Sequence, residues 1–394
     1  MQQLKITDLA RPKFKANPYP FYARLRAQAP VCRTKFLGEP TWLVTRYDDV
    51  LRLLKDDRFV KDLPEKTRWL HFLAGAITRN MLNTDAPDHT RLRTLVHKAF
   101  TPNLIERLRE RIQSICEERL NDLEANGRMD LMSGYALPLP LTIIAELLGI
   151  PVEERKRFHT RSRTSLSSST MMGVLRAVPD QRLLIRQMRK LIARRRVDPC
   201  EDLITALVQA EEAGDKLSEK ELVATIFLLL IAGYETTVNL IGSGALALLQ
   251  HPRERERFER DPALTGSAVE ELLRYTSPLD MASQRFASED LTIAAVRISR
   301  GDLVIAVLGS ANYDESQFLN PETLDIAREP NKHLALGQGV HFCLGAPLAR
   351  LEGQIAMTTL FRRFPNLRLA VSPESLRWRK SLIIRGLEQL PVAI

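Results

Sequence analysis

A long apolar run in the middle of the chain constrains the fold more than any other feature. An S-x-x-E capping box occupies residues 218–221, and residues 222–250 read LVATIFLLLIAGYETTVNLIGSGALALLQ. Roughly 30 residues of helix extend about 45 Å. Because the first part is apolar on every side, we expect the rest of the chain to surround it. A membrane span is disfavoured, since the uncharged run stops at Glu235, short of the roughly 20 residues that a bilayer requires.

Helical patterns also dominate the rest of the sequence. One helix is expected to start at Asp48 as its cap, another begins near Pro87, and residues 102–196 are mostly amphipathic helix broken at prolines. Short β-like runs are TWLVT at residues 41–45 and, towards the C-terminus, LTIAAV, DLVIAVLG, NLRLAV and SLIIRG. We therefore predict a mainly α fold with a minor β region, folded as a single domain over residues 1–394.

Composition and charge restrict the class of protein. Hydrophobic residues make up 44% of the chain and charged residues 27%, as in ordinary soluble globular proteins. The net charge of +9 suits a solvated basic surface or an acidic protein partner, and no run of Lys and Arg with interleaved aromatic residues indicates nucleic acid. The four cysteines are widely spaced, and the N-terminus is polar and interrupted by prolines. A cytoplasmic protein without a leader or membrane anchor is therefore expected.

One cysteine lies in a glycine-rich stretch, LGQGVHFCLGAPLAR, at residues 336–350. Gly337 and Gly339 allow a tight or left-handed backbone, and an Ala-Pro step then opens a helix whose N-terminus would favour a thiolate. The third glycine of a dinucleotide-binding fingerprint is absent. Cys343 could be a nucleophile with His341 as its base, or a thiolate ligand of a metal. The shielded loop and the lack of a second nearby cysteine fit the ligand better.

Two helical segments could also carry chemistry. In AGYETT, Glu235 and Thr236 interrupt the apolar face of the long helix, and a carboxylate beside a hydroxyl could hold water and pass protons. A threonine there could also open the helix locally. The alternative is an ion pair for Glu235 and simple packing for Thr236. Glu271 and Arg274 form an E-x-x-R pair on one helix face, a pattern that is common on protein surfaces.

Four basic side chains could together clamp an anionic cofactor, because arginine binds carboxylates through two parallel hydrogen bonds. His89 and Arg93 are four residues apart and share one helix face, whereas Arg285 and His341 are isolated in the sequence. Taken singly, each is as well explained as a surface or capping residue.

Together these segments resemble the cytochrome P450 haem-thiolate monooxygenases of bacterial type. Residues 336–350 resemble the family's F-G-x-G-x-H-x-C-L-G signature, AGYETT its oxygen-activating motif and ELLR its E-x-x-R helix. PDHTRLRTLVHKAFTP resembles the haem-contacting helix, PETLDIAREPNKHLALG the meander before the cysteine loop, and SLIIRGLEQLPV the C-terminal turn. The segments occur in the family's order from about Asn17 to Val392. Leu336 departs from the pattern, because the family usually has Phe there.

The resemblance implies a triangular cytochrome P450 fold, with haem b between the long central helix and the cysteine-loop helix. Cys343 would be the axial ligand of the haem iron, and Glu235 and Thr236 would deliver protons to bound dioxygen. Other cofactor contacts would be His89, Arg93, Ala232, Gly233, Arg285, His341 and Gly345. Among these, the two histidines and two arginines would bind the haem propionates, and Gly233 would leave room for oxygen and substrate. A structural triad holding the cysteine loop would comprise Glu271, Arg274 and Arg328.

The resemblance also places the walls of a substrate pocket. They would include Trp69, Leu70, Phe72, Leu229, Leu279, Met281, Ala282, Leu382 and Ile383. These residues are apolar, which suggests a lipid-, terpenoid-, steroid- or polyketide-like substrate.

The expected activity is insertion of one oxygen atom from dioxygen by a monomer without a membrane span. No flavin or ferredoxin module is fused to the chain, so electrons would come from a separate ferredoxin and an NAD(P)H-dependent reductase. Three alternatives remain at this point: a peroxide-driven haem peroxygenase, a non-enzymatic haem sensor or ligand-binding protein, and a haem enzyme that isomerises or dehydrates its substrate without dioxygen.

Overall fold

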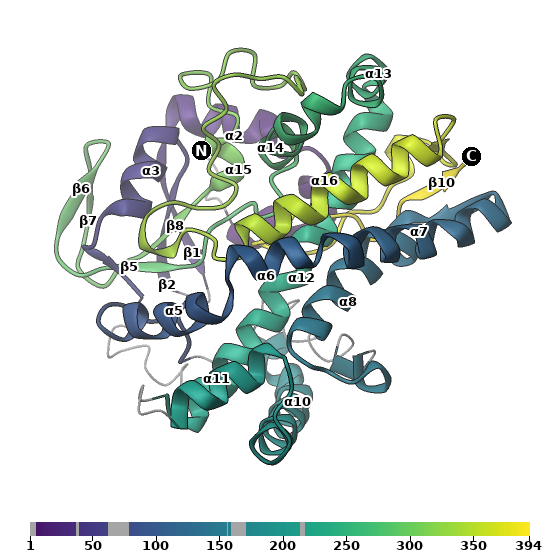
Figure 1. Cartoon of the computed structure of the whole chain (residues 1–394). Helices are drawn as coiled ribbons and strands as arrows, with labels where there is room; N and C mark the ends of the chain where they lie inside the picture. Colours follow the sequence, from purple (N-terminus) through teal and green to yellow (C-terminus); the bar gives the residue numbers. More distant parts are fainter. Residues whose placement is uncertain (1–4, 37–38, 62–78, 156, 159–170, 213–216) are drawn as a thin grey trace. The chain divides into compact units, whose positions relative to one another are not determined.

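Contacts between residues divide the chain into two units, each assembled from segments that lie far apart in the sequence. Unit 1 contains residues 1–59, 107–140 and 235–394, and unit 2 contains residues 60–106 and 141–234. The computed structural model describes residues 5–36, 39–61, 79–155, 157–158, 171–212 and 217–394, with the element labels of Figure 1. The expectation of a single domain stays a prediction.

The long apolar run forms α12 (Glu219–Gln250), a continuous helix of 32 residues. The predicted capping box is present, with the Ser218 N–H donating to the Glu221 carboxylate at 2.8 Å and the Glu221 N–H donating to Ser218 Oγ at 3.3 Å. The helix does not break at AGYETT, contrary to the local opening considered above. In the described part of the chain α12 is the one helix long and apolar enough to cross a membrane, but 67% of its most apolar window is buried in protein, as in a core helix.

Unit 1 holds a five-stranded sheet that joins N-terminal and C-terminal segments in the order β1-β2-β8-β5-β3. The β2 and β8 strands are parallel, and the β1–β2 and β5–β8 pairs are antiparallel. Apolar side chains of α3, among them Val50 and Leu53, pack in one core with Val44 and Val304 of the sheet. The strands are β1 (Val31–Phe36), β2 (Glu39–Val44), β3 (Phe59–Val60), β5 (Arg285–Ala287) and β8 (Leu303–Ala306).

The remaining strands of unit 1 form a three-stranded sheet and a hairpin. The sheet consists of β4 (Arg128–Asp130), β10 (Pro391–Ala393) and β9 (Arg368–Leu369), and the hairpin of β6 (Leu291–Ile293) and β7 (Val296–Ile298).

Helices make up most of unit 1, and two of them, α7 and α16, lie side by side (Figure 1). Tyr135 lies in a π-helical turn (Met132–Ala136), and its hydroxyl donates to the Ala356 carbonyl at 2.7 Å, which fixes this turn to α16. The helices are α1 (Pro12–Ala16), α2 (Tyr19–Gln28), α3 (Tyr47–Lys55), α7 (Arg109–Asn126), α13 (Pro252–Arg260), α14 (Thr265–Thr276), α15 (Leu308–Ala311) and α16 (Ala346–Arg363).

In the described part of unit 2 the regular elements are helices, apart from the end of β3. It contains α5 (Asp88–Ala99), α10 (Met171–Val197) and α11 (Leu203–Glu212), and α11 packs against both of the others. Arg91 of α5 forms an ion pair with Glu221 in the first turn of α12 at 2.5 Å. Three helices contain residues of both units: α6 (Pro102–Arg107), α8 (Pro138–Leu147) and α12.

The mainly α prediction is confirmed, but three local predictions are wrong. The break expected at prolines is absent at Pro179, which lies inside the continuous helix α10. Asp48 does not cap α3: the helix begins one residue earlier, and Asp48 lies in its first turn. SLIIRG forms no strand but only an isolated bridge between Ile384 and Leu279. Its backbone groups instead bond to an irregular segment, for example through the Arg385 N–H and the Pro278 carbonyl at 3.0 Å.

One buried acid in unit 1 has no cation beside it. Glu352 of α16 is 1% exposed, neither of its carboxylate oxygens has a hydrogen-bond partner among the described residues, and burial raises its pKa from 4.5 to about 8. The folded protein therefore binds this proton more tightly than the unfolded chain does.

We expect this proton to make stability depend on pH. The free energy of unfolding should fall as pH rises from about 4.5 to 8, by up to about 1.4 kcal/mol per pH unit from this group, and the fall should end above pH 8. Glu352→Gln should remove this slope in urea unfolding followed by circular dichroism. The control Glu374→Gln, at an exposed position, should keep it. A Glu352→Gln protein with the slope of the parent would contradict the assignment.

Candidate functional site

The cysteine loop is a short closed structure at the start of α16. Gly337 and Gly339 both have φ +72°, the left-handed region that the sequence predicted for them. The Cys343 N–H donates to the Leu336 carbonyl at 2.9 Å and closes the loop. Cys343 is half-buried and lies three residues before the first residue of α16, whose N-terminal N–H groups favour negative charge nearby. Gly345 caps that helix, and a Cβ on it would lie 4.0 Å from the sulfur.

The end of α3 supports this loop. A Cβ at Gly339 would fall 2.5 Å from the Leu54 carbonyl oxygen, so only glycine allows this approach. The same carbonyl accepts a hydrogen bond from Arg285 Nη2 at 3.3 Å, and Arg285 Nη1 donates to the Phe59 carbonyl at 3.3 Å. The structure therefore brings a buried guanidinium next to the cysteine loop. His341 lies in the loop itself, half-buried in a 3-10 turn. Leu54 carried no recognisable signal in the sequence, because it acts only through its backbone.

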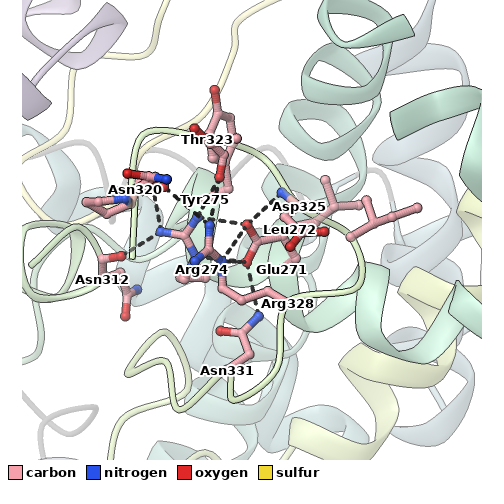
Figure 2. Close-up of polar contacts among 12 residues, drawn as sticks. Glu271, Leu272, Arg274, Tyr275, Asn312, Asn320, Thr323, Asp325, Arg328 and Asn331 are labelled. Atoms are coloured by element: carbon pink, nitrogen blue, oxygen red, sulfur yellow. Dashed lines mark hydrogen bonds and ion pairs between the residues drawn. The ribbon is translucent and has the colours of Figure 1, made fainter. Parts of the chain in front are cut away.

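The three residues predicted as a triad lie together in unit 1 (Figure 2). Arg274 donates to both oxygens of Glu271 at 2.8 Å, and Arg328 donates to the same two oxygens at 3.2 Å. The Asn331 amide and the Asp325 N–H add donors at 3.1 Å each. Glu271 and Arg274 are fully buried, so this carboxylate is stabilised entirely by protein groups. The sequence predicted the E-x-x-R pair but not Asn331.

Hydrogen bonds connect this network to the cysteine loop. Arg274 Nη1 donates to the Asn312 carbonyl at 2.8 Å, and Asn312 Oδ1 accepts from the Leu334 N–H at 2.7 Å. The Leu334 carbonyl accepts from the Gly337 N–H at 2.9 Å, which is the first bond of the loop. The buried charges thus set the path by which the chain enters the loop.

A second glutamate on α14 anchors the helix that leaves the loop. Arg350 of α16 binds Glu270 with two hydrogen bonds at 2.7 and 2.8 Å, and His333 Nε2 lies 3.1 Å from the same carboxylate. Burial alone would raise the pKa of Glu270, but these two partners lower it to about 2. Sequence reasoning missed all three residues, although Glu270 adjoins the E-x-x-R pair and Arg350 ends the glycine-rich stretch.

The acid of AGYETT has a definite partner. The Glu235 side chain is 3% exposed and forms an ion pair with Arg379 from the C-terminal segment. Thr236 is half-buried, and the next residue, Thr237, is buried. The structure therefore contains the ion pair that the sequence considered as the alternative for Glu235. Such a pair is compatible with a proton-delivering role, because ion pairs can open.

Other predicted cofactor contacts lie in unit 2. His89 is buried and Arg93 half-buried on α5, where their spacing places them on one face of the helix. Ala232 is exposed and Gly233 half-buried in α12. A Cβ at Gly233 would lie 2.8 Å from Ile144 of α8, so within unit 2 the missing side chain makes room for Ile144.

The predicted pocket residues of unit 1 cluster where the C-terminal segment meets the chain after α14. The Asp280 and Met281 N–H groups donate to the Ile383 carbonyl at 2.8 and 3.2 Å. Leu279 and Ala282 are half-buried, Leu382 is buried and Ile383 is 45% exposed, whereas Met281 is fully buried. Leu229 belongs to unit 2, and Trp69, Leu70 and Phe72 lie outside the described residues.

The donor set fits a haem-thiolate centre. A porphyrin supplies four nitrogen ligands itself, so the protein needs to provide a single sulfur. Among the described residues no group of three or more His, Cys, Asp or Glu could hold a metal ion, whereas Cys343 stands alone in a rigid loop at a helix N-terminus with a buried arginine nearby. These features suit one axial thiolate and an anionic porphyrin edge.

Comparisons with known proteins found relatives that are similar over nearly the whole chain. The family model "Cytochrome P450" matches residues 7–194, 181–261 and 262–378. The chain is 47% identical over 398 residues to the polyketide biosynthesis cytochrome P450 PksS of Bacillus subtilis, with 97% of each chain covered. The solved structure of that protein superposes with a TM-score of 0.91 and 98% of each chain covered. A myxobacterial cytochrome P450, CYP267B1, in complex with myristic acid, is 43% identical, with a TM-score of 0.93 and the same coverage.

We expect the Glu271 network to dominate stability in unit 1. Glu271→Gln should lower the free energy of unfolding by about 3–5 kcal/mol, because it leaves two arginines beside a neutral partner in a buried site. Urea unfolding followed by circular dichroism measures the change. The control Glu289→Gln removes an exposed partner of Arg58 and should change stability little. Equal effects of the two substitutions would show that the buried pair has no special weight.

Proposed function

Because the chain belongs to the cytochrome P450 family, whose members bind haem b through a cysteine thiolate, we propose that Cys343 ligates the haem iron here. The protein is a cytochrome P450 monooxygenase, and its proposed reaction inserts one atom of dioxygen into an apolar small molecule. The second oxygen atom leaves as water, formed with two electrons and two protons. The observation that carries the assignment of the ligand is the closed glycine loop that presents Cys343 at the start of α16.

Bound haem supplies the oxygen chemistry, and the residues of the chain bind, orient and shield it. In the proposal the Cys343 thiolate is held by the loop and by the helix N-terminus. In unit 1 the proposed propionate-binding residues are Arg285 and His341, and in unit 2 they are His89 and Arg93. Arginine suits this role because its guanidinium forms paired hydrogen bonds with a carboxylate.

Glu235 and Thr236 are the proposed proton-delivering pair. The hydroxyl of Thr236 can donate a proton and accept another from a neighbouring acid, and the buried position of Glu235 limits leakage of bulk water. The presence of both residues favours an enzyme that uses dioxygen and electrons over one driven by peroxide.

The proposed substrate is a long apolar molecule such as a polyketide or a fatty acyl chain. Two observations support this class: the apolar residues Leu279, Leu382 and Ile383 cluster in unit 1, and similar proteins are named for polyketide biosynthesis or were solved with myristic acid. The electrons are proposed to come from a separate ferredoxin and an NAD(P)H-dependent reductase. The net charge of +9 suits an acidic electron donor, and a cytoplasmic monomer is proposed.

Cys343→Ser should abolish the thiolate-type absorption band of the carbon monoxide complex of the reduced protein, because serine cannot supply a sulfur ligand. The band is measured after reconstitution with haem and reduction. Cys200→Ser, at the exposed cysteine, should leave the band unchanged. Survival of the band in Cys343→Ser would exclude Cys343 as the ligand.

Binding of an apolar substrate beside the haem should shift the absorption spectrum of the reconstituted protein. We expect the tightest spectral titrations with fatty acids of intermediate length and with polyketide lactones, and Ile383→Asp should weaken these by about tenfold or more, since it places a charge on an apolar wall. A matched exposed change, Val371→Asp, should have little effect. Preference for small polar compounds across the panel would contradict the proposed class.

A further inference from the structure

The C-terminal segment 377–388 is a hairpin whose two arms are held together by backbone bonds. The Glu388 N–H donates to the Arg377 carbonyl at 2.8 Å, and the Arg379 N–H donates to the Gly386 carbonyl at 2.9 Å. Between these bonds, Trp378 and Leu387 form an antiparallel bridge. We call this segment the C-terminal hairpin.

The arms of the C-terminal hairpin lie directly on α12. A Cβ at Gly386 would fall 1.8 Å from Asn239 Oδ1, so the backbone there touches the Asn239 side chain and only glycine fits. Asn239 Nδ2 in turn donates to the Glu235 carbonyl at 2.9 Å, one turn earlier in the helix. The hairpin is therefore packed against the turn of α12 that carries Glu235.

Arg379 forms an ion pair with Glu235 from this position. The Arg379 side chain is 22% exposed, whereas that of Glu235 is 3% exposed, so the arginine reaches a carboxylate that is closed off from solvent. Glu235 Oε1 takes part in the pair, and Oε2 is buried without a hydrogen-bond partner in the described structure. A buried carboxylate with one satisfied oxygen is costly to keep, and such costs are typical of functional positions.

The other charged side chains of the C-terminal hairpin do not compete for this role. Arg377, Lys380 and Glu388 are exposed. Arg385 donates instead to the backbone carbonyls of Lys15, Ala16 and Thr276.

The tip of the C-terminal hairpin is also anchored. The Ile383 carbonyl accepts from Asp280 and Met281, and the Leu382 carbonyl accepts from the buried Lys15 ammonium at 2.9 Å. Because the tip and the arms are both held, the guanidinium of Arg379 starts from a defined place on the hairpin.

We propose that Arg379 is a positioning residue for Glu235, and that the C-terminal hairpin holds the guanidinium where the Glu235 carboxylate rests between proton deliveries to Thr236. This inference rests on the proposed function, because it assumes that Glu235 and Thr236 deliver protons. Successive helix residues point about 100° apart, so the carboxylate must leave Arg379 to reach the hydroxyl and can return to it afterwards. In this scheme the guanidinium is the resting place of the carboxylate between turnovers.

The test compares Arg379→Gln, Arg379→Lys and the control Arg377→Gln, which removes an exposed charge from the same hairpin. Arg379→Gln should lower the product formed per electron consumed severalfold and raise the solvent isotope effect on turnover, with substrate affinity unchanged. The thermal midpoint should fall as well, because the substitution leaves the buried Glu235 carboxylate without its cation. Arg379→Lys should restore part of the loss. Arg377→Gln should behave as the parent protein. A purely structural arginine would lower the thermal midpoint but leave the product yield per electron and the solvent isotope effect unchanged, and that result would overturn the proposal.

Two further measurements separate this proposal from the proposed function. The double variant Glu235→Gln/Arg379→Gln should lose no more product per electron than Glu235→Gln alone, because the two residues act as one functional pair. Additive losses would overturn the proposal. The infrared band of the Glu235 carboxylate, identified by subtracting the spectrum of Glu235→Gln, should shift in Arg379→Gln and not in Arg377→Gln. This band needs no oxygen chemistry, so an unmoved band overturns the role of Arg379 even if the protein is an active monooxygenase. A shifted band supports the role even where turnover fails.

Discussion

The fully buried carboxylate of Glu271 is the interaction on which the cysteine loop depends. This carboxylate accepts hydrogen bonds from two arginines, an asparagine and a backbone N–H. Arg274 also donates to backbone carbonyls of the segment that leads to the loop, among them that of Asn312. Removing charges from water is costly, so such a site is stable only when nearly all of its donors and acceptors are paired. The need to pair these buried groups restricts residues 312–337 to one backbone conformation.

Two neighbouring glutamates on α14 stabilise the two ends of the cysteine loop. Glu271 acts through Asn312 and Leu334 on the chain that enters it, and Glu270 binds Arg350 on the helix that leaves it. The end of α3 supplies the third support, since its Leu54 carbonyl meets both Gly339 and Arg285. A sulfur held from three sides changes little in position, and this suits an axial ligand whose geometry tunes the metal.

Those features of the fold and of the candidate site that depend on residues close together in the chain could be predicted from the sequence. The capping box of α12, the left-handed glycines at 337 and 339 and the E-x-x-R pair depend on residues close in the chain, and all are present. The errors arose where distant segments compete for the same backbone. SLIIRG has the composition of a strand, yet its backbone groups bond to the irregular chain around Pro278, and Asp48 lies inside a helix that starts one residue earlier than expected.

By itself the sequence determined the candidate groups for chemistry: one cysteine in a glycine loop, an acid beside a hydroxyl on a core helix, and a glutamate three residues before an arginine. Only the tertiary structure decided the partners of the buried charges. Asn331 is 60 residues from Glu271, and Arg379 is 144 residues from Glu235. A buried charge is stable only where the fold brings an opposite charge or a set of hydrogen-bond dipoles next to it. The spacing of residues along the chain does not predict these pairs, because each pair depends on how all the intervening segments pack.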